Sequence, residues 1–86
     1  MINLGTAKTL DRLGIMNLYK VGGGGTFYWD RDVSIKILLE KLPYGVDIHK
    51  GIMDYFVECR DIKVKHKNLE EALARLIIKL HKEKII

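Results

Sequence analysis

The sequence predicts an α+β domain in which a small antiparallel sheet of two to four strands packs against two or three helices. Apolar residues recur at helical spacing in two segments, at residues 31–42 and 69–83. Between these segments, residues 53–60 alternate between apolar and polar side chains, which is typical of a half-buried strand. A chain of 86 residues with 48% hydrophobic content has the size and composition of a single globular domain, spanning residues 1–86.

A short helix is expected near the start of the chain. Ala7, Leu10 and Leu13 follow one another at three-residue intervals, which places them on one side of a helix. Thr6 is a candidate N-cap, and Gly14 occupies a position suited to the C-terminal cap.

A hairpin is expected next. Residues 15–21 alternate in character and residues 26–29 are β-formers, with four glycines at residues 22–25 between them. Four consecutive glycines specify no single turn, so we expect a flexible loop there. The run lacks the lysine and hydroxyl pair and the following helix of a phosphate-binding loop, so it does not indicate nucleotide binding.

Three aromatic residues, Phe27, Tyr28 and Trp29, follow the glycines. Consecutive side chains of a strand point to opposite faces, which excludes a stacking platform of all three rings and puts at least one in the core. We favour a structural role, in which Trp29 caps the sheet and holds the following helix while Tyr28 stays at the surface. The alternative is that the rings stack on nucleic-acid bases beside lysines.

The helix expected at residues 31–42 has a single apolar stripe. Its members are Ile35, Leu38, Leu39 and Leu42. Asp30 or Asp32 can cap the start of this helix, and Pro43 cannot continue it. The two aspartates therefore indicate a helix cap rather than a catalytic pair.

Three extended segments are expected after this helix. Residues 46–48 form an alternating fragment, and the run from His49 to Gly51 is a turn signal. The strand at residues 53–60 follows. Its apolar side consists of Met53, Tyr55, Val57 and Cys59. A third short strand, or an extension beyond a bulge, is expected at residues 61–66.

The C-terminal helix at residues 69–83 has the most complete sequence signature. Asn68 is an N-cap residue, and Glu71 three positions later approximates a capping box. Ile78 broadens the apolar stripe of this helix, and the chain ends in two further isoleucines. Because this is more apolar surface than one small sheet face covers, we expect a protein partner or self-association.

The basic residues of the chain are concentrated in one run. The formal net charge is +4, and residues 60–67 contain four cationic side chains against the single acidic residue Asp61. Cationic side chains neutralise phosphates, so these residues and Tyr28 are candidate nucleic-acid contacts. The candidates are Arg60, Lys63, Lys65, Lys67 and Tyr28. The favoured interpretation is that the lysines line a solvated strand edge and discourage unwanted strand pairing.

No residue pattern indicates catalysis, a metal or a cofactor. The three histidines lack metal-ligand spacing, and Cys59 falls on the apolar side of its strand, where a lone thiol behaves as a small hydrophobe. We therefore expect no enzymatic activity, no cofactor and no bound metal. A single cysteine favours a reducing, cytoplasmic location, and neither a secretion signal nor a membrane-spanning run is expected.

Four stretches resemble the small phage proteins with an ABA-sandwich domain. They are residues 29–42, Val46-Asp-Ile-His49, Tyr55-Phe-Val-Glu-Cys59 and Asn68-Leu-Glu-Glu-Ala-Leu-Ala-Arg-Leu76. This resemblance implies an amphipathic helix, a strand pair and a final helix, together with a phage or prophage origin. The last stretch is also similar to the ending of HicB-like antitoxin domains, although Asn68 stands where that family commonly has threonine.

The order of strands and final helix is similar to that of double-stranded RNA-binding domains. Glu70 and Glu71 stand where those domains have a basic signature, and acidic residues there would repel phosphates. Together, these patterns favour a small non-enzymatic interaction or regulatory protein of phage or mobile-element type that acts through a protein surface. The alternative is a nucleic-acid-binding protein that uses the basic strand at residues 60–67.

Overall fold

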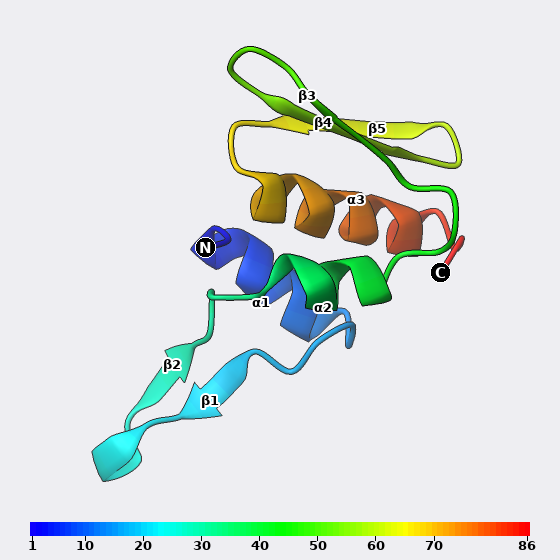
Figure 1. Cartoon of the computed structure of the whole chain (residues 1–86). Helices are drawn as coiled ribbons and strands as arrows, with labels where there is room; N and C mark the ends of the chain where they lie inside the picture. Colours follow the sequence, from blue (N-terminus) through cyan, green and yellow to red (C-terminus); the bar gives the residue numbers. More distant parts are fainter.

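The computed structural model describes residues 1–86 and arranges them in three layers with a projecting hairpin (Figure 1). The elements in chain order are α1 (Leu4–Arg12), β1 (Tyr19–Val21), a 3-10 turn (Gly23–Gly25), β2 (Phe27–Trp29), α2 (Ile35–Glu40), β3 (Asp47–Lys50), β4 (Tyr55–Cys59), β5 (Ile62–His66) and α3 (Leu69–Lys82). The strands form two antiparallel sheets, one of β1 and β2 and one with the order β3-β4-β5. The predicted α+β class is confirmed, with the strands divided between two small sheets.

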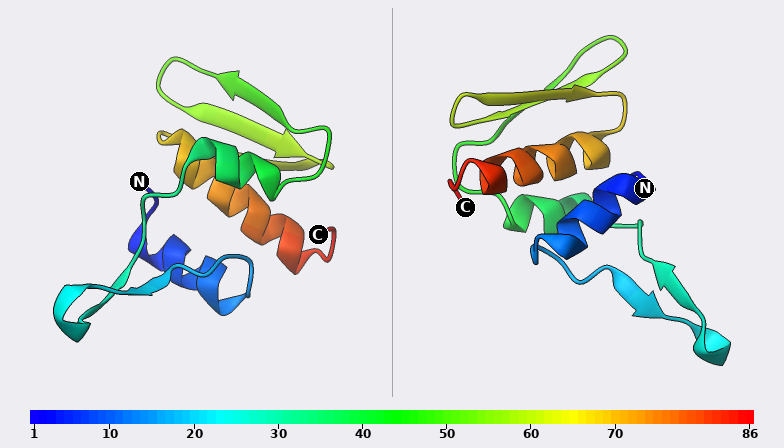
Figure 2. Two further views of the ribbon diagram at one scale, coloured as in Figure 1. Left: turned by 60° about the horizontal axis from the view of Figure 1, so that its bottom comes forward. Right: turned by 180° about the vertical axis from the view of Figure 1, so that it is seen from behind.

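Helix α3 lies at the centre of the molecule, with the three-stranded sheet on one side and α1 and α2 on the other (Figures 1 and 2). Its buried residues are Glu71, Ala72, Leu73, Ala74, Leu76, Ile77 and Leu80. A helix covered on two sides buries more than one stripe, which explains why Ala74 is buried as well as Leu73 and Leu76. Ile78 is half-buried against the same core. The broad apolar surface of α3 is therefore covered within one chain and no longer supports self-association.

Helix α1 begins earlier than predicted, because its N-cap residue is Asn3 and not Thr6. Thr6 lies inside the first turn, and its hydroxyl donates a hydrogen bond to the carboxylate of Glu71 at 2.5 Å. The predicted glycine cap is confirmed. Gly14 has a φ of 75°, and the next N–H reaches back to the C=O of Leu10 at 3.0 Å, which completes a Schellman motif.

Helix α2 is shorter than predicted. Its N-cap is Ser34, whose side chain accepts a hydrogen bond from the N–H of Ile37 at 3.2 Å. The prediction that Asp30 or Asp32 caps this helix is therefore wrong. The Asp30 carboxylate instead accepts the N–H of Asp32 at 3.1 Å, in a turn that precedes the helix.

The segment before α2 is extended because it pairs with the N-terminal residues. The N–H of Ile2 donates to the C=O of Arg31 at 2.9 Å, and Nε of Arg31 donates to the C=O of Ile2 at 2.8 Å. Ile2 is fully buried, so this pairing fixes the segment against the core. A helix that started at residue 31 would break both hydrogen bonds, and the tertiary pairing therefore outweighs the local helical pattern.

The three-stranded sheet corrects two predicted boundaries. His49 and Lys50 belong to β3 rather than to a turn, because they pair with Phe56 and Tyr55 of β4. β5 is a separate strand, joined to β4 by the two-residue turn Arg60–Asp61 rather than by a bulge. Both turn residues have positive φ, at 53° and 67°, as a type I′ hairpin turn requires.

One face of this sheet packs on α3 and the other is open. Val57, Cys59 and Val64 are the buried residues of the packed face. The contacts with α3 come mainly from β4 and β5. None of the three helices has the length and hydropathy needed to cross a bilayer.

Candidate binding surfaces

The β1–β2 hairpin projects from the layer of α1 and α2 as an arm (Figure 1). Its register pairs Tyr19 with Trp29. The N–H of Gly22 donates to the C=O of Thr26 at 2.6 Å, which makes this a hydrogen-bonded pair of the ladder. Such pairs alternate along an antiparallel ladder, so Tyr19 and Trp29 form a non-hydrogen-bonded pair, in which opposite side chains approach most closely.

An aromatic cluster covers one face of the arm, and we call Tyr19, Val21, Phe27 and Trp29 the aromatic face. The rings of Tyr19 and Phe27 stack with centroids 5.3 Å apart and planes 9° apart. The ring of Trp29 lies 4.8 Å from that of Tyr19 at an angle of 45°. Trp29 packs against the core, whereas Val21 and Phe27 remain 64% and 61% exposed. The aromatic face is therefore ordered by its own stacking but only partly covered.

This cluster changes the interpretation of the three consecutive aromatic residues. Tyr28 is exposed on the opposite face, and Phe27 shares a face with Trp29 without entering the core. Three rings do come together, because Tyr19 of the neighbouring strand lies between the other two. Tyr19 is not among the residues predicted from the sequence to belong to a site. No signal in the sequence pairs residues 19 and 29, because four glycines do not specify the register of the hairpin.

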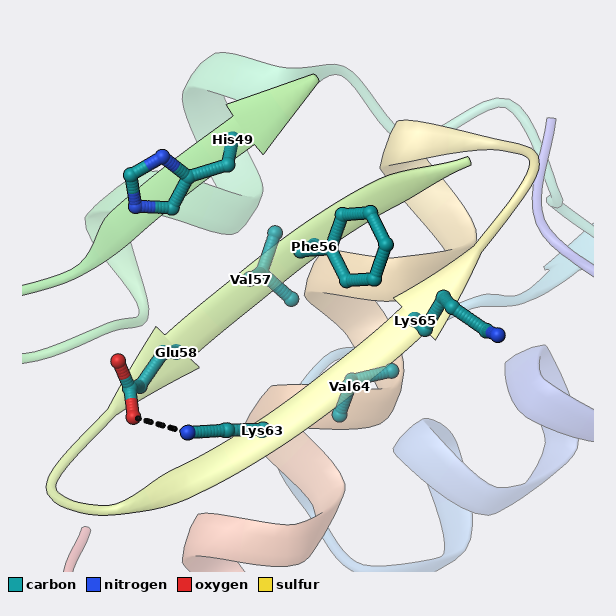
Figure 3. Close-up of a pocket in the computed structure, with 7 residues that line it drawn as sticks. All are labelled: His49, Phe56, Val57, Glu58, Lys63, Val64 and Lys65. Carbon is teal, nitrogen blue, oxygen red and sulfur yellow. Dashed lines mark ion pairs between the residues drawn. The ribbon is translucent and has the colours of Figure 1, made fainter. Parts of the chain in front are cut away.

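The second surface is the open face of the three-stranded sheet, which we call the sheet face. Two rows of side chains cross its three strands in register. The first row is Asp47, Glu58 and Lys63, and the second is His49, Phe56 and Lys65. A hollow of about 310 Å³ lies on this face, and Figure 3 shows the residues that line it.

The charges on the sheet face are mixed. Glu58 and Lys63 form an ion pair at 3.6 Å, drawn in Figure 3. Asp47 and Glu58 lie directly opposite one another on neighbouring strands. This arrangement is unfavourable because both side chains carry the same charge. Two acidic residues thus offset Lys63 and Lys65, and the sheet face is not a uniformly basic patch.

The five candidate nucleic-acid residues do not form one site. Lys63 and Lys65 lie on the sheet face, Arg60 lies in the β4–β5 turn and Lys67 follows β5, all of them exposed. Tyr28 belongs to β2 of the arm, and the arm lies across the helical layers from the three-stranded sheet (Figure 1). The aromatic ring that does accompany the lysines is Phe56, which the sequence analysis did not consider as a contact.

Glu71 is the only fully buried charged residue. Its carboxylate accepts hydrogen bonds from the N–H of Asn3 at 2.8 Å and the hydroxyl of Thr6, and it pairs with Nε of Arg75 at 2.5 Å. Burial raises the pKa of this carboxyl, but the hydrogen bonds and the charge of Arg75 together outweigh burial and lower the pKa below 4.5. Glu71 therefore joins α1 to α3 and is not free to bind a ligand.

The predicted capping box of α3 is half formed. The Asn68 side chain accepts the N–H of Glu71 at 3.1 Å, as expected for an N-cap residue. The reciprocal hydrogen bond is absent, because the Glu71 carboxylate turns to α1 and the N–H of Asn68 donates to Nδ1 of His66 at 3.0 Å.

Other chemically reactive side chains are dispersed. Cys59 is a buried free thiol in the packed face of the sheet, while His49 lies on the sheet face. No three His, Cys, Asp or Glu side chains lie close enough together to hold a metal ion. A second hollow of about 290 Å³ between the base of the arm and α2 combines Lys20 and Lys41 with Asp30 and Asp32, so its charges offset one another.

Comparisons of the chain with protein families, curated proteins and solved structures found no match. The two surfaces that bear on function are the aromatic face of the arm and the sheet face.

Proposed function

We propose that this chain is a small non-enzymatic interaction protein that binds a partner protein through the aromatic face of its arm. The observation that carries the proposal is the exposure of the stacked Tyr19 and Phe27 rings on a hairpin that projects from the body. Contiguous exposed apolar patches on soluble proteins mark interaction sites. Aromatic residues are also enriched in protein interfaces.

A purely structural role explains the arm poorly. A two-stranded hairpin is only marginally stable by itself. Of the residues on the aromatic face, Trp29 packs against the core. Full burial of a Val or Phe side chain contributes about 1.5–3 kcal/mol to the free energy of unfolding. Val21 and Phe27 are largely exposed, so the chain does not gain most of this stabilisation from them. A partner surface that covers these two side chains would supply that burial.

The charge of the arm favours a protein over a nucleic acid. Between residues 17 and 29, Lys20 is the only charged residue, and the register places it on the face opposite the aromatic face. Nucleic-acid backbones are held by several cationic side chains. An apolar surface on a protein partner therefore complements this face better than a phosphate backbone does.

The test is affinity capture from lysate of the source cells with tagged wild-type protein and with a Val21→Ser, Phe27→Ser double variant. We expect the partner to be at least about tenfold depleted with the double variant, because its apolar contacts are lost. Both side chains are exposed, so the free energy of unfolding should change by no more than about 0.5 kcal/mol at Val21. At Phe27 the loss should be about 1 kcal/mol, because the stacked pair with Tyr19 is removed.

The matched control is Lys36→Ser, an exposed substitution on α2 away from the arm, which should retain the partner fully. Equal recovery of the partner with the wild type and the double variant would contradict the proposal. The absence of any protein retained specifically by the wild type would also contradict it.

One observation favours a second function, nucleic-acid binding on the sheet face. Phe56 lies between His49 and Lys65 in the row shown in Figure 3. Single-stranded bases stack on aromatic side chains of sheet surfaces beside cationic groups. Asp47 and Glu58 in the adjacent row oppose phosphate binding, and for this reason the nucleic-acid function ranks second.

Titration with labelled single-stranded and duplex DNA tests this second function. If it holds, binding at about 50 mM salt should weaken steeply towards about 200 mM. Phe56→Ala and Lys65→Gln should each weaken binding by about tenfold, while Lys36→Gln should have little effect. No binding at low salt would exclude the nucleic-acid function and leave the arm as the site.

We further propose a phage or mobile-element origin and a cytoplasmic location. The phage or mobile-element origin is supported by the resemblance of residues 27–80 to small phage proteins. The cytoplasmic location is supported by the free thiol of Cys59, because free thiols persist in reducing compartments.

A further inference from the structure

Strand β3 is an uncovered edge of the three-stranded sheet. The strand order is β3-β4-β5, and all four residues of β3 are exposed. Ile48 points to the helix side of the sheet, since it pairs with the buried Val57. It nevertheless remains 41% exposed, because α3 packs mainly under β4 and β5. An exposed edge with an apolar side chain is a template for pairing with another strand.

The backbone of β3 offers hydrogen-bonding groups at this edge. The N–H of Gly51 donates to the C=O of Asp54 at 2.7 Å, which makes residues 51 and 54 a hydrogen-bonded pair of the β3–β4 ladder. Because such pairs alternate in an antiparallel ladder, Asp47 and His49 bond to β4. Ile48 therefore directs its N–H and C=O away from β4, towards the free edge.

The side chains of β3 are complementary to a second copy of the same strand. If two β3 strands pair antiparallel with Ile48 opposite Ile48 of the second copy, both residues present the outward N–H and C=O that a reciprocal pair needs. Asp47 then lies opposite His49 of the second copy, and the symmetry repeats this contact. A shift by two residues instead places two Asp47 or two His49 side chains opposite each other, so only the first register pairs a carboxylate with an imidazole that can donate a hydrogen bond to it.

The other free edge does not offer this complementarity. β5 presents Lys63 and Lys65 on the sheet face, and antiparallel pairing of two such strands brings like charges together. Lysines on edge strands oppose this kind of pairing. The chain thus has one edge that resists pairing and one that is self-complementary.

We infer that two copies of this chain associate through antiparallel pairing of their β3 strands about Ile48, which joins their sheets into one six-stranded sheet. This interface is separate from the aromatic face of the arm, so the arm stays free for a partner protein. Self-association is thus explained by the free edge of β3 and not by the broad apolar surface of α3.

Analytical ultracentrifugation of the full chain from about 1 to 500 µM tests the inference. The wild type should pass from a mass of 9.9 kDa to twice that mass. Ile48→Pro removes an N–H that points to the free edge, a position where edge strands tolerate proline, and the variant should remain a monomer. A wild type that stays monomeric throughout would overturn the inference.

A charge exchange provides a second test that does not depend on proline. Asp47→Lys alone places lysine opposite His49, and His49→Asp alone places two carboxylates opposite each other, so each variant alone should dimerise at least about tenfold more weakly. In an equimolar mixture, the introduced lysine faces the introduced aspartate and Asp47 faces His49. The mixture should therefore recover dimerisation.

The matched control is Lys65→Asp, which makes a similar charge change on the other edge strand and should leave the dimer unchanged or stronger. If the single variants dimerise like the wild type, or the mixture fails to recover, β3 pairing is wrong. A dimer that survives Ile48→Pro but is lost in the Val21→Ser, Phe27→Ser variant would assign self-association to the arm. Loss of partner capture alone would leave β3 pairing unaffected.

Discussion

The carboxylate of Glu71 accepts the backbone N–H of Asn3 at 2.8 Å, a contact between residues 68 positions apart. Asn3 is the N-cap residue of α1, so a side chain from the first turn of α3 satisfies a donor at the start of the first helix. The same carboxylate accepts the hydroxyl of Thr6 and pairs with Arg75. This buried contact fixes the position of α1 on α3.

Removal of the carboxylate should destabilise the fold. In Glu71→Ala, the N–H of Asn3 and the hydroxyl of Thr6 lose a charged acceptor in a buried setting, and we expect a loss of about 3 kcal/mol in the free energy of unfolding. Urea denaturation measures this loss. The neighbouring Glu70→Ala is the control, and its effect should stay within about 0.5 kcal/mol. Equal effects at both positions would show that the contact does not contribute to stability.

The same carboxylate predicts a pH dependence. Its pKa in the folded chain lies below 4.5, the value expected after unfolding, so the unfolded chain binds the proton more tightly. The stability contributed by ionised Glu71 is therefore fully present above pH 4.5 and is lost as the pH falls through the folded-state pKa. Urea denaturation between pH 7 and pH 3 should show the wild type and Glu71→Gln converging at low pH. A constant difference would contradict the lowered pKa.

Local periodicity was sufficient to predict α3 and β4, and it left residues 61–66 open as a separate strand or an extension beyond a bulge. The apolar residues of these segments recur at helical or strand spacing, and the structure buries Val57, Val64 and Leu76 accordingly. The start of α2 could not be predicted in this way, because the pairing of Arg31 with Ile2 keeps the preceding segment extended. Ile2, the partner of Arg31 in this pairing, lies far from it in the sequence.

The candidate surfaces were predicted less completely than the fold. The basic run correctly predicted that Lys63 and Lys65 are exposed. It could not predict whether they lie near Tyr28, because that depends on how the two sheets are arranged in space. Tyr19 was missed because its role depends on hairpin register, which four glycines do not specify. The burial of Glu71 could not be predicted either, because its hydrogen-bond partners Asn3 and Thr6 lie at the opposite end of the sequence.

The end of α3 should be stabilised by glycine. Lys84 has a φ of 60° at the position that follows the C-cap, and the N–H of Ile85 reaches back to the C=O of Leu80 at 2.9 Å. This Schellman geometry favours glycine over a residue with a Cβ, so Lys84→Gly should stabilise the fold by about 1 kcal/mol. Thermal unfolding should show a rise of about 4–8 °C. Lys82→Gly, inside the helix, should lower the melting temperature instead.

The β4–β5 turn should respond in the same direction. Arg60 and Asp61 both adopt positive φ, where Asn-Gly is the preferred pair of a type I′ turn. The double variant Arg60→Asn, Asp61→Gly should therefore raise the free energy of unfolding by about 1–2 kcal/mol. Asp61→Gly alone should give part of this gain. A loss of stability in both variants would show that the turn is not of this type in solution.

The order of the arm can be followed through Trp29, the only tryptophan of the chain. Tyr19 lies between Phe27 and Trp29 in the aromatic face, so Tyr19→Ser removes the ring that covers Trp29. We expect its fluorescence emission to shift to longer wavelength, with a loss of only about 1 kcal/mol in the free energy of unfolding, because aromatic pairs contribute at that level. Tyr28→Ser changes the opposite face and should leave the emission unchanged. An unchanged emission in Tyr19→Ser would show that the stacked rings do not form in solution, and the exposed aromatic face would then no longer support partner binding through the arm.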